Sequence, residues 1–250
     1  MSWQGENDYA LFQSSFPMLD KQLWSAFYQL NQDKINVKND KIAVEKLQNI
    51  ILTTFKLASQ HGFASMSLRE LSQKTGISMG GLYNYIGSKH QLAQMINEFL
   101  PYAFFTCLEP FNQQSSSNID KLLTLVRTHL FVSQSMKDWF FFAFMEAKHV
   151  DKDVRAIVKS NESETEQMLF ATLNQANQSG EISLDEHEIV LMAMMIKGLL
   201  QNWYIKHYRY RQAKISCEQY SEFVEKSIKK QLGLELDEES NREKNLTGTV

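Results

Sequence analysis

The chain has 250 residues with a formal net charge of −3, and it contains only 10 glycines and 3 prolines. This scarcity of turn residues and the absence of strand-like alternation exclude a β-rich fold and predict helices nearly throughout. No apolar run approaches the length of a membrane span. The first twelve residues lack the pattern of a signal peptide, and Cys107 and Cys217 lack metal-ligand spacing. We therefore expect a soluble, cytoplasmic, all-α protein with reduced thiols.

Residues 1–38 are predicted to be an N-terminal extension with one amphipathic helix. The apolar residues Leu19, Leu23, Trp24, Phe27 and Leu30 share one helical face, and residues 1–8 are expected to be loose. This helix is either a packing arm over an apolar groove of its own or a partner subunit, or an arm for the DNA minor groove. The small number of Lys and Arg favours packing.

A longer helix is expected to follow, capped by Asn39 or Asp40 and ending at His61, with Gly62 as its stop. Its apolar residues recur at helical spacing. We interpret them as structural core that supports the next two helices. The net charge of residues 41–100 is +3, which leaves −6 for the rest of the chain. This asymmetry fits a small nucleic-acid-facing domain joined to a larger acidic one, although chance variation in surface charge gives the same pattern.

Two short helices separated by a tight turn are predicted between Gly62 and Leu92. Ser67 is the expected N-cap of the first, with Glu70 completing a capping box, and Gly76 permits a left-handed turn. Ser78 is the expected N-cap of the second helix, and Ser88 with Gln91 opens the helix after it. A helix, a tight turn and a second helix form the motif that places the second helix in the DNA major groove.

Several short motifs occur at fixed spacing between Ile50 and Leu92: Gly62-Phe63, Ser67 to Leu71, Thr75 to Ser78, Gly80, Leu82-Tyr83 and Ser88-Lys89. This block resembles the DNA-binding domain of the TetR family of bacterial transcriptional regulators. The resemblance implies a DNA-binding domain at residues 39–87 and a helical domain for effector binding and dimerisation at residues 88–233. Met79, Gly81 and Ile86 depart from the residues frequent in the family, which affects individual DNA contacts and not the fold.

The second helix of the motif is predicted to read DNA. Gly80 and Gly81 each cost about 1 kcal/mol of helix propensity relative to alanine, a cost that close approach of the backbone to DNA would offset. Tyr83 and Asn84 suit a phosphate and a base edge, and the resemblance assigns phosphate contacts to Tyr83 and Lys89. The alternative for the tyrosines is packing in the small core. The candidate DNA-binding residues are Ser67, Ser78, Met79, Gly80, Gly81, Tyr83, Asn84, Tyr85 and Lys89.

The rest of the chain is predicted to form further helices. Pro101 should kink or end the helix that starts at Ser88, at a point that either transmits movement between domains or is an ordinary helix break. Asn112 to Asn118 should be a loop, and residues 234–250 a disordered tail. The expected later helices span residues 120–133, 136–150, 153–177, 183–209 and 216–232, the fourth of them with a Ser183/Glu186 capping box and the fifth with a Ser216/Gln219 capping box.

Residues 139–145 carry bulky apolar side chains on every helical face, so this helix should be buried all round. Such residues pack in a core more often than they line a pocket, but the resemblance implies an effector pocket here. The candidate ligand-binding residues are Phe104, Trp139, Phe142, Met145, Met168, Met195, Trp203 and His207.

The neighbourhood of Trp203, Tyr208 and Arg209 is similar to TetR-family regulators of fatty-acid or acyl-CoA metabolism, in which a basic rim could hold coenzyme A. The alternative is that these cations stabilise the C-terminal end of a helix dipole. The resemblance further implies that the last two long helices, through Ile189, Met192, Ile196, Leu199, Trp203, Tyr220, Phe223, Ile228 and Leu232, form a four-helix bundle with a second copy.

No catalytic or metal-binding motif is present, so neither an enzyme nor a cofactor is expected. The sequence predicts a homodimeric repressor that binds a palindromic operator in double-stranded DNA and is released by a small apolar effector, a fatty acid or an acyl-CoA. The alternative is a helix-turn-helix regulator whose helical domain binds a partner protein or peptide.

Overall fold

The computed structural model describes residues 2–37, 39–111 and 117–234. These residues form helices and no strand, which confirms the predicted fold class. The helices in chain order are α1 (Tyr9–Ser15), η1 (Pro17–Leu19), α2 (Leu23–Asn31), η2 (Gln32–Lys34), α3 (Asp40–His61), α4 (Leu68–Thr75), α5 (Met79–Ile86), α6 (Lys89–Leu108), η3 (Glu109–Phe111), α7 (Asn118–Ser135), α8 (Lys137–Glu146), α9 (Lys152–Gln178), α10 (Glu186–Ile205), α11 (His207–Gln212) and α12 (Cys217–Gln231).

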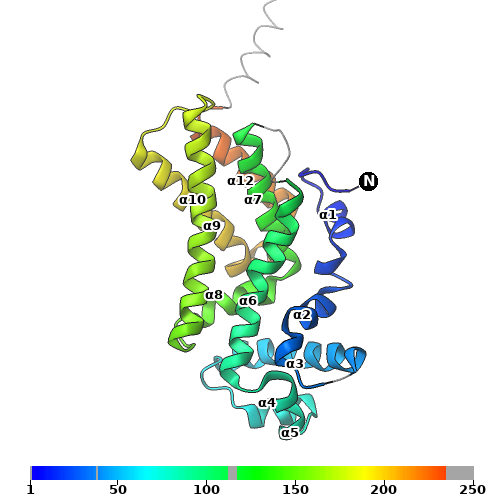
Figure 1. Ribbon diagram of the computed structural model, residues 1–250. Helices are drawn as coiled ribbons and strands as arrows, with labels where there is room; N and C mark the ends of the chain where they lie inside the picture. The colour runs from blue at the N-terminus through cyan, green and yellow to red at the C-terminus, as the bar shows by residue number, and fades with distance from the viewer. Residues whose placement is uncertain (1, 38, 112–116, 235–250) are drawn as a thin grey trace, which may run out of the picture.

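Helices α3, α4 and α5 form a unit at one end of the molecule, here called the head, and helices α6 to α12 form the body (Figure 1). The side chain of Asn39 caps α3 by accepting a hydrogen bond from the Ile42 amide at 3.1 Å, and the helix ends at Gly62 with φ +84°. Leu47, Ile50 and Ile51 of α3 are fully buried. The head therefore has an apolar core to which α3 contributes one face.

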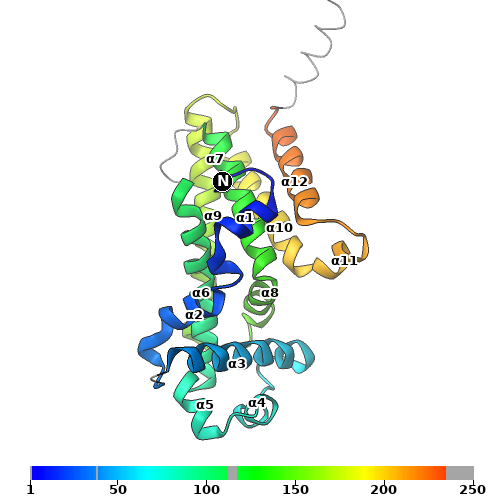
Figure 2. The same cartoon turned by 90° about the vertical axis from the view of Figure 1, so that its right-hand side faces the viewer.

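The body is a bundle in which α6, α7, α9 and α10 run roughly side by side (Figures 1 and 2). Helix α12 packs on α7 and α10, and α11 projects away from α6 and α9 (Figure 2). The short helix α8 packs against α3 of the head as well as against α6 and α10. Together with α6, which follows α5 directly and packs on it, α8 therefore connects the bundle interior with the head.

Pro101 was expected to kink or to end its helix. Helix α6 continues through Pro101, which excludes the helix end. Proline has no backbone N–H, which leaves the Asn97 carbonyl four residues earlier without its intrahelical donor. The side chain of Asn161 on α9 supplies that donor, with its Nδ2 atom 3.0 Å from the Asn97 carbonyl oxygen. A tertiary contact thus satisfies the backbone group that proline leaves free.

Several helix ends differ from those expected. Helix α10 begins with a capping box of Asp185 and Glu188 rather than Ser183 and Glu186. The single helix expected over residues 183–209 ends at Ile205, and a separate helix, α11, begins after Lys206. Ser67 caps α4 as predicted, but Glu70 contacts His61 at 3.1 Å instead of closing a capping box. Asn118 already belongs to α7. The rest of the predicted loop, residues 112–116, and residues 235–250 of the predicted tail lie outside the described residues.

The start of the chain is anchored, so the expectation that residues 1–8 are loose was wrong. Trp3 is only 2% exposed, with its ring centroid 5.0 Å from those of Phe12 and Phe111. Its backbone amide donates to Ser15 Oγ at 2.7 Å, and its indole N–H donates to the Glu6 carbonyl at 2.6 Å. Arg127 of α7 donates to the Gly5 carbonyl and pairs with a glutamate of α12. These contacts fix the extension to the body.

The amphipathic helix of the extension is α2, which starts only at Leu23 because Leu19 lies in η1. It packs on α3 and α6 of the same chain, as expected for a packing arm (Figure 1). Lys34 then forms an ion pair with Glu98 of α6 at 2.7 Å. The backbone amide of Asn36 donates to the Asn84 carbonyl of α5 at 2.8 Å. The extension therefore runs from the body to the second helix of the head.

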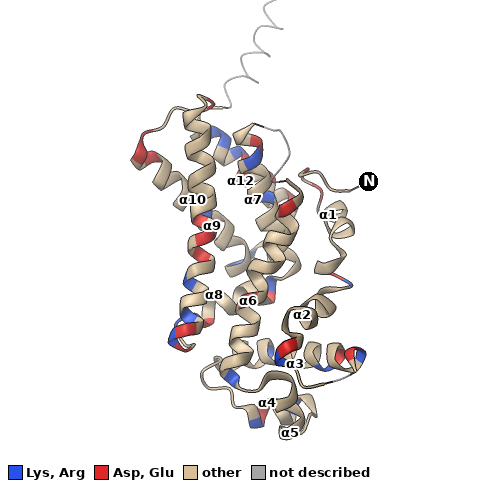
Figure 3. Ribbon diagram, viewed as in Figure 1, with Lys and Arg blue, Asp and Glu red and all other residues tan. Residues whose placement is uncertain are grey.

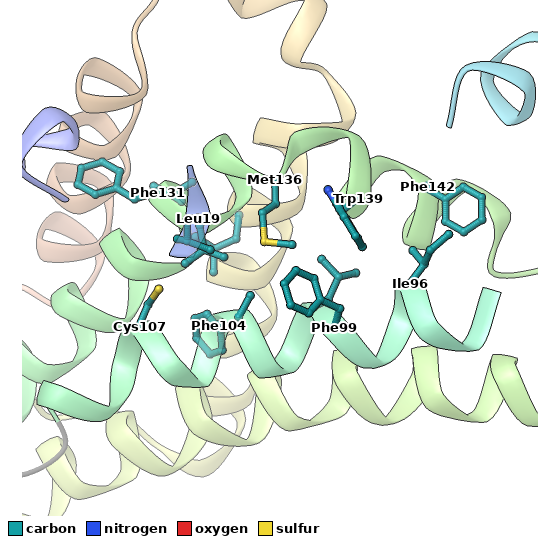
Figure 4. Packing of buried hydrophobic residues seen from close by; sticks show 14 of the residues in the cluster. Leu19, Ile96, Phe99, Phe104, Cys107, Phe131, Met136, Trp139 and Phe142 are labelled. Atoms are coloured by element: carbon teal, nitrogen blue, oxygen red, sulfur yellow. The ribbon is translucent and has the colours of Figure 1, made fainter. Parts of the chain in front are cut away.

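Trp139 of α8 lies at the junction of extension, head and body. Its ring centroid is 5.1–5.6 Å from four other aromatic rings, those of Trp24, Phe27, Phe55 and Phe99. Figure 4 shows Trp139 pointing toward α6, beside Phe99. Trp139 is 3% exposed. It is therefore a core residue that joins α2, α3, α6 and α8, and not a wall of a ligand pocket.

We predict that Trp139→Ala lowers the free energy of unfolding by about 3–5 kcal/mol, because it leaves a large cavity among four rings. Chemical denaturation followed by circular dichroism measures this. Phe170→Ala on α9, where the ring is 40% exposed, is the matched control and should cost less than about 1 kcal/mol. Equal effects of the two substitutions would show that Trp139 does not have this joining role.

Candidate nucleic-acid interface and ligand cavity

Helices α4 and α5 form a helix-turn-helix whose turn has the expected caps. Ser67 Oγ accepts a hydrogen bond from the Glu70 amide at 3.1 Å, and Ser78 Oγ accepts one from the Gly81 amide at 3.2 Å. Gly76 between the helices has φ +68°, in the left-handed region that a Cβ atom disfavours. The local sequence thus sets the angle at which α5 leaves the turn.

Helix α5 has a buried and an exposed face. Leu82 and Ile86 are fully buried, whereas Tyr83 is 48% exposed and Gly80 and Asn84 are exposed. Met79 and Gly81 are half-buried at the N-terminal end of the helix. The exposed backbone and side chains form one surface at the end of the head, and α5 carries no charged residue (Figure 3). This surface is the candidate face for DNA.

Two predicted DNA-binding residues have other contacts in the head. Tyr85 is 7% exposed and packs in the core, where burial raises the pKa of its hydroxyl, so its prediction as a DNA contact was wrong. The ammonium of Lys89 donates to the Ala64 carbonyl at 2.8 Å and lies 4.8 Å from the centroid of the Phe63 ring. Partial burial lowers the pKa of Lys89. To reach a phosphate, Lys89 must leave these contacts.

Helix α4 of the motif carries two further cations, Arg69 and Lys74, and both are exposed. Both contribute to the net charge of +3 of residues 41–100, but no DNA contact was predicted for either of them. Their position in a helix-turn-helix could have indicated a role in phosphate binding, because the phosphate contacts of such motifs come from several elements around the recognition helix.

The body contains a cavity of about 70 Å³ lined by α6, α7, α8, α9 and α10. This volume is enough for a few water-sized groups, so a larger ligand would have to displace side chains that line the cavity. Its apolar wall includes Leu100, Phe104, Phe140, Phe144 and Val158. Pro101, at which α6 lacks an N–H group, also lines the cavity.

Polar groups meet at the same cavity. Lys197 and Tyr204 of α10 are 5% and 6% exposed, and His129 of α7 is 3% exposed. Burial, helped by the charge of Lys197, holds the pKa of His129 well below its usual value, so this imidazole is neutral. Its Nδ1 atom and the Oδ1 atom of Asn97 have no hydrogen-bond partner. The cavity therefore combines apolar walls with unsatisfied polar groups, the combination typical of ligand sites.

Only one of the eight predicted ligand-binding residues, Phe104, lines this cavity. Phe142 and Met145 line a separate groove between α3 and α8, and Met145 is 43% exposed. Met168 and Met195 are half-buried against the core. Trp203 and His207 also lie outside the cavity. Trp203 stacks on Tyr210 and Tyr220, with ring centroids at 5.2 and 5.0 Å, and the His207 ring packs on Trp203 at 5.5 Å.

The prediction that the helix of residues 139–145 is buried on every face was wrong. The ligand-binding residues chosen from this helix were therefore not the ones that face the cavity. Phe140 and Phe144 are half-buried because they face the cavity, and Phe141 faces the groove with Met145. The missed residues Lys197 and Tyr204 had a signal in the sequence. Lysine and tyrosine occur seven residues apart, on one helical face, in the mostly apolar segment from Ile189 to Ile205.

Comparisons with known proteins agree with this architecture. Residues 50–96 match the model of the bacterial regulatory proteins of the TetR family, which covers its N-terminal domain and spans α4, α5 and parts of α3 and α6. The chain thus carries a TetR-family N-terminal domain. A curated relative, the HTH-type transcriptional regulator HbdR of Aromatoleum sp. (strain CIB), is 20% identical over 200 residues, which are 77% of this chain and 81% of the relative.

Two solved structures show the TetR-type fold over most of the chain. AibR, solved in complex with isovaleryl coenzyme A and operator DNA, is 18% identical with a TM-score of 0.61, covering 72% of this chain and 96% of AibR. FadR from Bacillus subtilis, solved in complex with stearoyl-CoA, is 17% identical with a TM-score of 0.56, covering 73% of this chain and 97% of FadR. At these identities the likeness concerns the fold.

This TetR-family chain is thus a DNA-binding transcriptional regulator with a helix-turn-helix in its head. Among residues 2–37, 39–111 and 117–234 no helix is long and apolar enough to cross a membrane. Within the same ranges no three His, Cys, Asp or Glu side chains are grouped as metal ligands. The family model and the curated relative both describe regulators and no enzyme.

We predict that Gly80→Ala stabilises the protein and weakens DNA binding. A Cβ atom at Gly80 would meet no atom within 4 Å, so alanine should raise the free energy of unfolding by about 0.5–1 kcal/mol through helix propensity. The same methyl group would hold the α5 backbone away from DNA. Denaturation and fluorescence anisotropy with an operator fragment measure the two effects.

The control for this variant is Gln60→Ala at the exposed C-terminal end of α3, which should leave DNA affinity unchanged. If Gly80→Ala binds the operator as tightly as the wild type, the glycine has no role in close approach to DNA.

Proposed function

We propose that this TetR-family protein is a homodimeric repressor that binds a palindromic operator and is released by a small, largely apolar effector, a fatty acid or an acyl-CoA. The observation that carries the proposal is the cavity of the body, with its apolar wall and buried polar groups, which α8 lines next to the head. The acyl-CoA ligands named for AibR and FadR support the effector class. The predicted division of the chain at Ser88 is part of the same proposal.

Helix α8 provides the physical route from the cavity to the head. Phe140 and Phe144 face the cavity, while Trp139 and Phe142 on the other side of α8 contact Phe55 of α3, with ring centroids at 5.3 and 5.4 Å. An effector that enlarges the cavity must displace Phe140 or Phe144. Because packed cores are not continuously deformable, α8 and the head then move together.

A second contact ties the end of α8 to the head. The Glu146 carboxylate accepts a hydrogen bond from the backbone amide of Phe63 at 3.1 Å, directly after α3 ends. The ring of Phe63 lies 5.2 Å from that of Phe142. A shift of α8 would therefore act on the segment between α3 and α4, which determines where α5 lies. By linkage, effector and operator must weaken each other's binding equally.

The proposed dimer interface differs in detail from the one expected. Most of the residues predicted for it, such as Ile196 and Ile228, are buried within the protomer. The exposed apolar residues of α10 are instead Val190, Leu191 and Met194, which are 45%, 65% and 61% exposed. Phe223 of the adjacent helix α12 is 61% exposed. A two-fold axis at this surface would cover an apolar stripe and pair two heads for successive major grooves.

We predict that Leu191→Arg converts the dimer to a monomer, because it introduces a charge into the proposed apolar interface. Analytical ultracentrifugation at micromolar concentration measures the change. Leu52→Arg is the matched control, since Leu52 is 45% exposed on α3 and lies outside the stripe. A Leu191→Arg protein that sediments as the wild type does would exclude this interface.

Operator binding should weaken steeply with salt, because each neutralised phosphate releases a counterion. The test is to select bound genomic fragments, and then to measure the affinity for one of them between low and physiological salt by fluorescence anisotropy. A salt-insensitive affinity would contradict the proposed phosphate contacts. The same fragment then serves for effector assays, and native mass spectrometry of the purified protein identifies a co-purified small molecule.

A further inference from the structure

The cavity of the body contains an amino group that the protein itself leaves without a close partner. Lys197 is 5% exposed and forms no hydrogen bond or ion pair with the residues that the structure describes. Glu162 and Glu166 favour its charged form at longer range, while burial lowers its pKa. A buried ammonium without a hydrogen-bonded anion is costly. A ligand with an anionic group would remove this cost.

The neighbours of Lys197 fit the same kind of ligand group. Tyr204, two turns further along α10, lines the cavity, and burial raises the pKa of its hydroxyl, which therefore stays protonated as a donor. His129 is neutral and its Nδ1 atom has no partner. A carboxylate can accept hydrogen bonds from the ammonium and the hydroxyl at the same time. The imidazole adds no competing positive charge.

The other charged groups of the cavity limit how much negative charge it can take. Glu162 and Glu164 of α9 also line it and are half-buried. Glu162 accepts a hydrogen bond from Gln201 at 3.4 Å, and Glu164 accepts one from Ser160 at 3.4 Å. Lys197 can neutralise one carboxylate, whereas these two glutamates would repel the several phosphate charges of coenzyme A. The basic residues Arg209 and Arg211 lie on α11 and do not line the cavity.

We propose that the effector is a free carboxylic acid with an apolar body, not a coenzyme A thioester. Its carboxylate binds Lys197 and Tyr204, and its apolar part lies against Phe104, Phe140 and Phe144. This inference rests on the proposed function and specifies the ligand of the same site. It also explains why α10 keeps a lysine in an apolar run: the residue recognises the head group that distinguishes the effector from neutral apolar molecules.

The test uses straight-chain carboxylates from hexanoate to palmitate and phenylacetate, each with its methyl ester and its coenzyme A thioester. Isothermal titration calorimetry measures binding to the full chain, and fluorescence anisotropy measures release of a labelled operator. We expect at least one free acid to bind and to release the operator, and its ester and thioester to bind tenfold more weakly or worse.

Lys197→Met keeps the apolar part of the side chain and removes the charge. It should weaken binding of the acid by about tenfold or more, as expected for a lost hydrogen bond to a charged group, and leave binding of the ester unchanged. Tyr204→Phe removes only the hydroxyl and should weaken binding of the acid by about three- to tenfold. It provides the test if Lys197→Met does not fold. Lys159→Met, an exposed lysine on α9, is the control and should bind the acid as the wild type does.

The outcomes separate the two proposals. If an ester or a thioester binds and releases the operator as well as the acid does, or if Lys197→Met binds the acid with wild-type affinity, the carboxylate inference is wrong and the proposed effector function stands. If no acid, ester or thioester of the series binds, both the inference and the proposed apolar effector are wrong.

Discussion

The packing of Trp139 against four aromatic rings from three other helices is the contact on which the rest of the molecule depends. It brings the N-terminal extension, the head and the body into one hydrophobic core. A large indole buries more apolar area than other side chains, and rings in edge-to-face or tilted contact resist sliding past each other. The position of the head is therefore coupled to the bundle, because α3 must accommodate any change in the position of α8.

Helix α8 has opposite roles on its two faces. One face stabilises the core through Trp139 and Phe142, and the other leaves Phe140 and Phe144 half-buried at a cavity. A chain selected only for stability would fill such a cavity. It would also not leave the Lys197 ammonium, His129 Nδ1 and Asn97 Oδ1 beside it without hydrogen-bond partners, since voids and unsatisfied buried polar groups both destabilise a fold. The large core around Trp139 supplies the stability that this arrangement requires.

The head shows a similar division between folding and function. Leu82 and Ile86 hold α5 in place from within, so its outer face is free to keep two glycines that weaken the helix. The extension adds a constraint at the other end of α5, where the Asn36 amide binds the Asn84 carbonyl. The same extension is held to α7 and α12 through Gly5 and Asn7. The extension and α8 therefore link the position of the recognition helix to the body in addition to the direct connection through α6.

Local sequence was sufficient to predict the all-α fold, the helix-turn-helix and most of the ends of its helices. Caps such as Asn39, Ser67 and Ser78 act on amides three residues away, and Gly76 acts on its own backbone, so these features depend on local chemistry that a sequence displays directly. Three features depend instead on how the helices pack: which face of an aromatic helix lines a cavity, why α6 continues through Pro101, and that Trp3 is buried. Each of these depends on a partner far away in the chain, such as Asn161 for the carbonyl that Pro101 leaves free or Phe111 and Phe131 for Trp3. Apolar periodicity is the same for a residue that packs on a neighbour and for one that faces a void, so the distinction between Trp139 and Phe140 arises only when the helices meet.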